Sequence, residues 1–112
     1  MFGSEPSHSA KIALENFKKN NVKHIIELGA GLGRDTIFFA KNSIKVTALD
    51  YSPTAVEIIK NKSNSLGLGD LIEVQTHDLR QKLNFADNSF DGCYSHMLCL
   101  LYTSPSPRDL LK

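Results

Sequence analysis

The sequence predicts an α/β fold, built on a doubly wound, mostly parallel sheet with helices on its faces. Helical segments with one apolar face alternate with short, β-branched apolar runs, which is the pattern of such sheets. A glycine-rich turn, Gly29–Gly33, follows the first apolar run directly, and Ser52-Pro53 has the form of a helix start. The chain has 112 residues, so it can form one domain at most.

Each element has its own local signal. Ser7 or Ser9 can cap a first helix, and Asn20-Asn21 ends it. Predicted strands follow at 22–28, 44–49 (ending on Asp50), 71–76 and 90–95, with helices at 35–41 and from Ser52-Pro53 to about 66. The residues expected on the buried faces of the three helices are Ala10, Ala13, Leu14, Phe17; Ile37, Phe38, Ala40; and Ala55, Val56, Ile59.

Composition excludes several classes of protein. Charged residues make up 22% of the chain and the net charge is +1, so no strong field favours nucleic acid or a membrane surface. The apolar runs are shorter than the roughly 18 residues that a membrane span needs. Cys93 and Cys99 lack the spacing of metal ligands, so we expect no metal and place the protein in a reducing cytoplasm.

The glycine turn has the features of a ligand-binding loop. Gly29, Gly31 and Gly33 permit positive φ and leave the backbone open to a ligand, while the next helix start favours an anion. Their spacing is G-x-G-x-G, whereas the dinucleotide fingerprint is G-x-G-x-x-G. Glu27 precedes the loop; a carboxylate there suits a ligand that carries a cationic amine, although a surface charge is an equal alternative.

Two further acidic residues are expected at the same edge of the sheet. Asp50 ends the second strand, where a carboxylate can accept both ribose hydroxyls. Asp78 comes just after the third strand. Either one could instead cap a turn or a helix. Together with the glycine loop, they predict a site for a nucleoside with a positive charge.

Four stretches of the chain carry a resemblance to a known family. In order and spacing, "IIELGAGLG", "VTALDYSP", "VQTHDLR" and "FADNSFDGCYS" resemble the successive motifs of class I S-adenosylmethionine-dependent methyltransferases, over residues 22–98. The resemblance implies a Rossmann-like sheet, a methyltransferase activity and S-adenosylmethionine as cofactor. It also implies that Gly29, Gly31 and Gly33 approach the methionine part, with Glu27 near its amino group.

The resemblance implies roles for residues at the other strand ends. Asp50 would accept the ribose hydroxyls, with Tyr51 beside the adenine. Asp78 and Leu79 would bind the adenine edge, and Ser95 would face the sulfonium. The catalytic residues stay unassigned; His96 is a weak candidate on the substrate side, with simple packing as the alternative.

Shorter stretches indicate a subgroup. "FGSEPS", "GRDT" and "YSHML" are similar to the small tellurite and thiopurine type, which implies a small-molecule methyl acceptor. Arg34 and Asp35, within "GRDT", could equally be solvated residues at a helix start. Two other functions remain open: an NAD-type dinucleotide-binding domain and a non-catalytic module that binds an adenosyl ligand. Neither the acceptor nor the oligomeric state follows from the sequence.

The last residues depart from the pattern of an α/β domain. Cys99–Asp109, "CLLYTSPSPRD", resembles the in-frame translation of a transposase sequencing adapter. We therefore expect residues 1–98 to be the N-terminal part of a methyltransferase domain and residues 99–112 to be a non-native tail. On this interpretation the sheet is truncated after its fourth strand, the fourth strand is an exposed edge, and the fragment itself is inactive.

Overall fold

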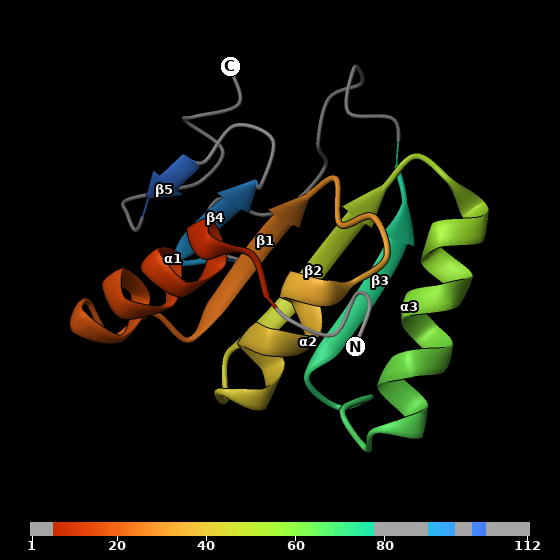
Figure 1. The fold of residues 1–112 in the computed structure, drawn as a ribbon, viewed down its shortest axis with the longest axis horizontal. Coiled ribbons are helices and arrows are strands. Elements are labelled where there is room, and N and C mark those ends of the chain that lie inside the picture. Colours follow the sequence, from red (N-terminus) through yellow and green to blue (C-terminus); the bar gives the residue numbers. More distant parts are fainter. Residues whose placement is uncertain (1–5, 78–89, 96–99, 103–112) are drawn as a thin grey trace.

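The computed structural model describes residues 6–77, 90–95 and 100–102, which form one β-sheet and three helices (Figure 1). The strand order is β3-β2-β1-β4-β5. The first four strands are mutually parallel, as predicted, and β5 runs antiparallel to β4. The elements are α1 (His8–Lys19), β1 (His24–Leu28), α2 (Arg34–Lys41), β2 (Lys45–Asp50), α3 (Pro53–Ser65), β3 (Ile72–Thr76), β4 (Gly92–Ser95) and β5 (Leu100–Tyr102).

The caps of α1 and α3 confirm the signals in the sequence. The Ser7 side chain accepts a hydrogen bond from the Ala10 amide, and α1 ends at Asn20. The Ser52 side chain accepts from the Ala55 amide, with proline in the first turn of α3. The buried faces also match the prediction, with Ser63 added on α3; they comprise Ala10, Ala13, Leu14, Phe17, Ala55, Val56 and Ile59.

Helix α2 buries a different face from the one predicted. Its buried residues are Asp35, Thr36, Phe39 and Ala40. Of the predicted set only Ala40 is among them; the others are partly exposed. The first turn of α2 faces polar groups of the sheet and of α1, so the polar side chains of Asp35 and Thr36 are buried there. Apolar periodicity alone does not predict buried polar positions.

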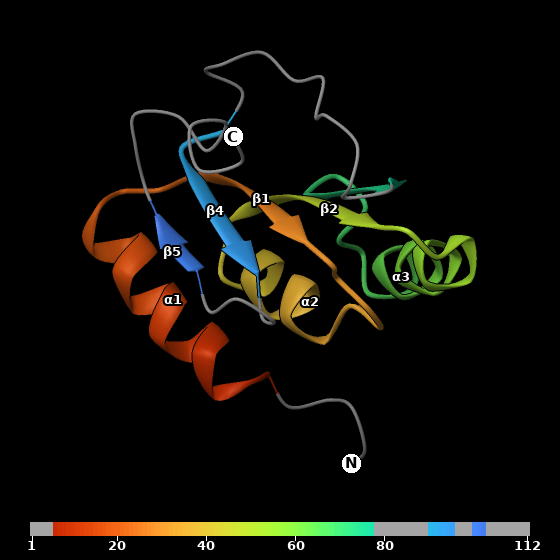
Figure 2. The ribbon, with the colours of Figure 1, turned by 90° about the horizontal axis from the view of Figure 1, so that it is seen from above.

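All three described helices cover the same face of the sheet (Figure 2). Their apolar side chains form one core with Ile25, Val46 and Tyr94 from the sheet. A second, smaller cluster lies on the opposite face and consists of Ile26, Leu28, Leu49, Phe90 and Cys93. The expectation of helices on both faces is therefore met on one face only, within the part of the chain that is described.

The expectation that the sheet ends at an uncovered fourth strand is wrong. Strand β5 pairs with β4 in the register Cys93↔Tyr102, Tyr94↔Leu101 and Ser95↔Leu100. A free strand edge presents unpaired amide and carbonyl groups, and these pair with whatever extended segment lies within reach. The short apolar stretch 100–102 supplies such a segment, inside the range that the composition sets apart as a tail.

Candidate functional site

The candidate site lies at the carboxyl edge of the sheet, where β1 turns into the glycine loop (Figure 1). Strands β1 and β2 are parallel and end level with each other, Leu28 beside Leu49. The loop then bends over the end of β2, because the amides of Gly29 and Ala30 both donate to the Leu49 carbonyl, at 2.8 and 3.1 Å. In open α/β sheets, ligands bind at this edge.

The glycines of the loop have the conformations that their sequence pattern predicts. Gly29, Gly31 and Gly33 have φ of +72°, +61° and +83°, a region that favours glycine. A Cβ added to Gly29 or Gly31 would meet nothing within 4 Å, so the space beside these two residues is open. A Cβ on Gly33 would lie 2.8 Å from Ile59 Cγ1. The first two glycines therefore border open space, whereas the third allows close packing of α3.

Asp50 ends β2 and holds the glycine loop. Its Oδ2 accepts from the Gly31 amide at 2.8 Å, and its Oδ1 accepts from the Ser52 amide at 2.9 Å. The side chain is buried, with 7% exposure. Each carboxylate oxygen has a second lone pair, so Asp50 can accept further hydrogen bonds from a ligand while it keeps the loop in place.

Glu27 is a buried carboxyl group on β1, with 2% exposure. The Thr36 hydroxyl donates to it. Burial, helped by the nearby carboxylates of Asp35 and Asp50 and opposed by the Thr36 hydrogen bond, raises the pKa of Glu27 from 4.5 to about 8. No described lysine, arginine or histidine forms an ion pair with it. A cation beside Glu27 would therefore be stabilised strongly.

Asp35 is buried rather than solvated, which excludes one of the two interpretations of this residue. It has 6% exposure. Its Oδ1 accepts from the Ser7 amide at 2.8 Å, and its Oδ2 accepts from the Ser7 hydroxyl at 2.8 Å and from the Tyr94 hydroxyl at 3.0 Å. Arg34, the other residue of the pair, is exposed, with its Nε 3.8 Å from Asp35 Oδ1.

The remaining predicted residues divide between two strand ends and the undescribed segments. Tyr51 follows Asp50 and is 76% exposed, at the rim of the site. Ser95 is the last residue of β4 and is buried, with 3% exposure. Asp78, Leu79 and His96 lie outside the described residues. The structure thus brings together Glu27, the three glycines and Asp50 at one edge.

Two contributors to the loop were missed from sequence. Thr36 binds Glu27, and its signal was its place on the same helix face as Phe39 and Ala40. Lys62 reaches back from α3, where its Nζ donates to the Leu32 carbonyl at 2.9 Å, instead of being only a solvated charge. A lysine on a solvent-facing helix position gives no sequence signal for such a contact.

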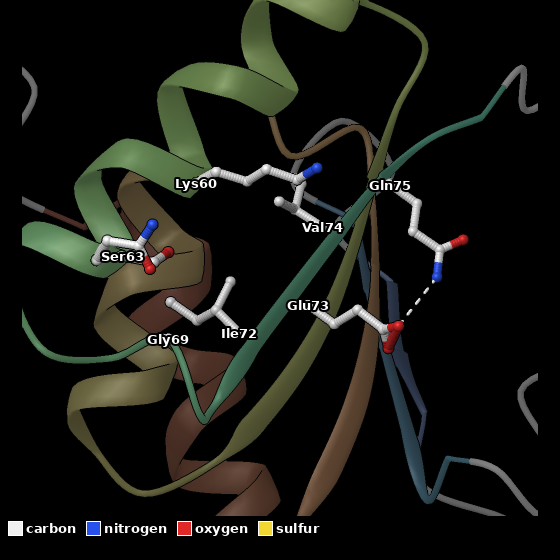
Figure 3. Close-up of a pocket in the computed structure, with 8 residues that line it drawn as sticks. Lys60, Ser63, Gly69, Ile72, Glu73, Val74 and Gln75 are labelled. Carbon is white, nitrogen blue, oxygen red and sulfur yellow. Dashed lines mark hydrogen bonds between the residues drawn. The ribbon is translucent and has the colours of Figure 1, made fainter.

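A separate hollow of about 480 Å³ lies beside β3 and α3 (Figure 3). Its lining is partly charged and partly apolar, and includes Lys60, Ile72 and Val74. Gln75 and Glu73 also line it, and the Gln75 side-chain amide donates to the Glu73 carboxylate at 3.2 Å. None of the predicted cofactor residues lines it. It is therefore a groove at the outer edge of the sheet rather than part of the candidate site.

Metal centres and membrane spans are both absent from the described ranges. Among those residues, no group of three or more His, Cys, Asp or Glu side chains is arranged to hold a metal ion. The described helices include none with the length and apolar character to cross a membrane.

The comparisons with known proteins identify a family for this chain. The Methyltransferase domain family matches residues 25–112. Ribosomal protein L11 methyltransferase of Exiguobacterium sp. is 37% identical over 60% of this chain and 22% of its own length. Sterol 4-C-methyltransferase strm-1 of Caenorhabditis elegans is 29% identical over 64% of this chain and 21% of its own length. The chain thus spans about a fifth of each of these relatives.

A solved structure supports the fold alone. The YcgJ protein of Bacillus subtilis superposes with a TM-score of 0.68 at 20% identity, over 79% of this chain and 37% of that one. The family match covers well over half of the chain and includes Glu27, the glycine loop, Asp50 and α3. The chain therefore belongs to the methyltransferase domain family.

Proposed function

We propose that the protein containing this chain transfers a methyl group from S-adenosylmethionine to a small-molecule acceptor, and that the described edge holds the cofactor. The observation that carries the proposal is the combination of an open glycine loop with a buried Glu27 before it and Asp50 at the next strand end. S-adenosylmethionine, when bound, supplies an electrophilic methyl group on a cationic sulfur.

The charges of the site favour this ligand over a dinucleotide. Asp50 and Asp35 surround Glu27 with negative charge. A pyrophosphate at the loop would be repelled by these groups, whereas a sulfonium or an ammonium would be attracted. We therefore rank the NAD-type alternative below the methyltransferase. A non-catalytic module that binds an adenosyl ligand stays as the second alternative, because a binding measurement does not distinguish it from an enzyme.

Each residue has a proposed task that fits its place. The backbone at Gly29 and Gly31 would lie against the methionine part, with Glu27 near the ammonium group. Asp50 would accept from the ribose hydroxyls with its remaining lone pairs, and Tyr51 would pack beside the adenine. The open space at the glycines, the burial of Glu27 and the exposure of Tyr51 support these tasks, which the family resemblance implies.

Four further residues have proposed roles at the ends of β3 and β4. Asp78 and Leu79 would bind the adenine edge, and Ser95 and His96 would face the sulfonium and the acceptor. Methyl transfer requires an aligned nucleophile and exclusion of water more than a strong base. We therefore assign His96 no more than a candidate role on the acceptor side.

The acceptor is proposed to be a small molecule. The names of the two relatives above point to different acceptors, a sterol and a ribosomal protein. The small-molecule acceptor rests on the likeness of "GRDT" and the flanking stretches to small methyltransferases. We also propose the cytoplasm as the compartment, because Cys93 is a free thiol.

We propose in addition that residues 99–112 are not native sequence, with residues 1–98 as the N-terminal part of the domain. The adapter resemblance supports this; the pairing of β5 and the family match through residue 112 weigh against it. Sequencing the genomic locus past Leu98 is the test. An unaltered reading frame through residue 112 would remove the proposal.

The cofactor proposal is tested by titration calorimetry of the 112-residue chain with S-adenosylhomocysteine and, separately, with NAD. We expect binding of the adenosyl amino acid and none of NAD. Binding of NAD alone would refute the methyltransferase assignment of the loop. Methyl transfer itself is then measured on the gene's full product with a panel of small thiols, amines and metalloid oxyanions.

A further inference from the structure

The carboxylate of Asp35 joins three parts of the chain that are distant in sequence. Ser7, at the start of α1, is 28 residues away, and Tyr94, near the end of β4, is 59 residues away. Both place donors on this one carboxylate, which is buried in the first turn of α2. Ser7, Asp35 and Tyr94 are called the Asp35 cluster below.

The members of the Asp35 cluster also hold their own elements. The Ser7 hydroxyl accepts from the Ala10 amide at 3.1 Å, so the same oxygen caps α1 and binds Asp35. The Tyr94 hydroxyl lies 3.1 Å from the Ser9 hydroxyl. The Tyr94 ring packs edge-on against the Phe39 ring of α2, with the ring centroids 5.0 Å apart. A shift of α1, α2 or β4 would therefore break hydrogen bonds that join it to the others.

The Asp35 cluster is adjacent to the candidate site on two sides. Asp35 comes two residues after Gly33, and the next residue, Thr36, binds Glu27. Tyr94 stands beside Glu27 in the sheet register and precedes Ser95. A carboxylate that only offset the helix dipole would need no burial and no donors from other elements. The geometry goes beyond what a helix start requires.

We propose that Asp35 is a positioning residue: by binding the start of α1 and the end of β4 to the first turn of α2, it holds the glycine loop in its ligand-ready shape. This inference deepens the proposed function and rests on it for the ligand arm of its test. The shape of the loop without ligand is tested independently of that function.

The first arm measures hydrogen exchange of the chain without ligand. Tyr94→Phe removes one hydroxyl and leaves the ring packing in place. We expect exchange of the Gly33 and Ile37 amides, which bond to Ala30 and Gly33 carbonyls, to become about tenfold faster relative to amides of β2. Unchanged relative exchange would overturn the proposal.

A matched control separates positioning from general stability. Val74→Ala removes buried methyl groups from β3, away from the Asp35 cluster. It is expected to lower stability without changing exchange at the loop relative to β2. If the control loosens the loop as much as Tyr94→Phe does, the effect is general and the proposal is wrong. Asp35→Asn is measured in the same way, and if that variant fails to fold, Tyr94→Phe still decides.

The second arm measures the Kd of S-adenosylhomocysteine by calorimetry. We expect Tyr94→Phe and Asp35→Asn to weaken binding about tenfold, against less than about twofold for Val74→Ala. Equal affinities in all variants would overturn the link between the Asp35 cluster and the ligand. Absence of binding by the unaltered chain would refute the proposed function, and the exchange measurement would still decide whether Asp35 positions the loop.

Discussion

Glu27 gives a sharp test of the site, because its buried carboxyl is expected to control how stability depends on pH. Its pKa is about 8 in the folded chain, against an ordinary value of 4.5. The folded state therefore keeps a proton that the unfolded state loses between these two values. Stability should fall as pH rises from 4.5 towards 8, and the contribution should be constant above that range.

The size of this effect follows from the pKa difference. At about 1.4 kcal/mol for each pKa unit, the rise from 4.5 to about 8 corresponds to an upper limit of about 5 kcal/mol. Glu27→Gln removes the titrating group and keeps an acceptor oxygen for the Thr36 hydroxyl. The variant should thus lose this pH dependence without losing the hydrogen bond.

The assay is urea unfolding of the unaltered chain and of its Glu27→Gln variant at pH values from about 5 to about 8. The free energy of unfolding of the unaltered chain should fall, relative to that of Glu27→Gln, by up to about 4 kcal/mol over this range. Parallel curves for the two proteins would refute the reasoning about burial. A cationic ligand should also lower the pKa of Glu27, so calorimetry near pH 7 in two buffers should detect release of a proton on binding.

The other predictions concern Asp50 and the third glycine of the loop. Asp50→Ala should weaken binding of S-adenosylhomocysteine by about 1.5–3 kcal/mol, roughly tenfold to more than a hundredfold, whereas exposed Asp70→Ala should leave it unchanged; an unaffected affinity would remove Asp50 from the site. Gly33→Ala should destabilise the chain by about 2 kcal/mol in urea unfolding, because it combines a positive φ with a contact at 2.8 Å from Ile59. Gly67→Ala has a similar φ of +71° with open space, so a loss as large as that of Gly33→Ala would refute the packing argument.

The fold was predictable where local chemistry decides it. The caps Ser7 and Ser52 and the apolar runs of β1 and β2 act within a few residues, and their elements begin and end within about two residues of the expected positions. Strand β5 was not predictable, because the stretch 100–102 forms a strand only by pairing with the free edge of β4. A tertiary partner, not its own composition, decides its conformation.

The site was predictable in its glycines and less so in its carboxylates. Gly31 and Asp50 follow from the spacing of loop and strand end, and the structure joins them by a hydrogen bond. The burial of Asp35 was not predictable, because its donors, Ser7 and Tyr94, come from segments far along the chain. A helix-start aspartate has the same local sequence whether it is solvated or surrounded by hydroxyl groups.

The three buried carboxyl groups at this edge are stabilised in different ways, and the difference indicates where a ligand's charge belongs. Asp50 accepts from two backbone amides, and Asp35 accepts from an amide and two hydroxyls. The Glu27 carboxyl accepts from the Thr36 hydroxyl and lies near the carboxylates of Asp35 and Asp50, so burial favours its protonated form. A cation beside Glu27 would lower its pKa and let it ionise inside the fold. An adenosyl amino acid carries an ammonium group, whereas a dinucleotide phosphate would increase the repulsion.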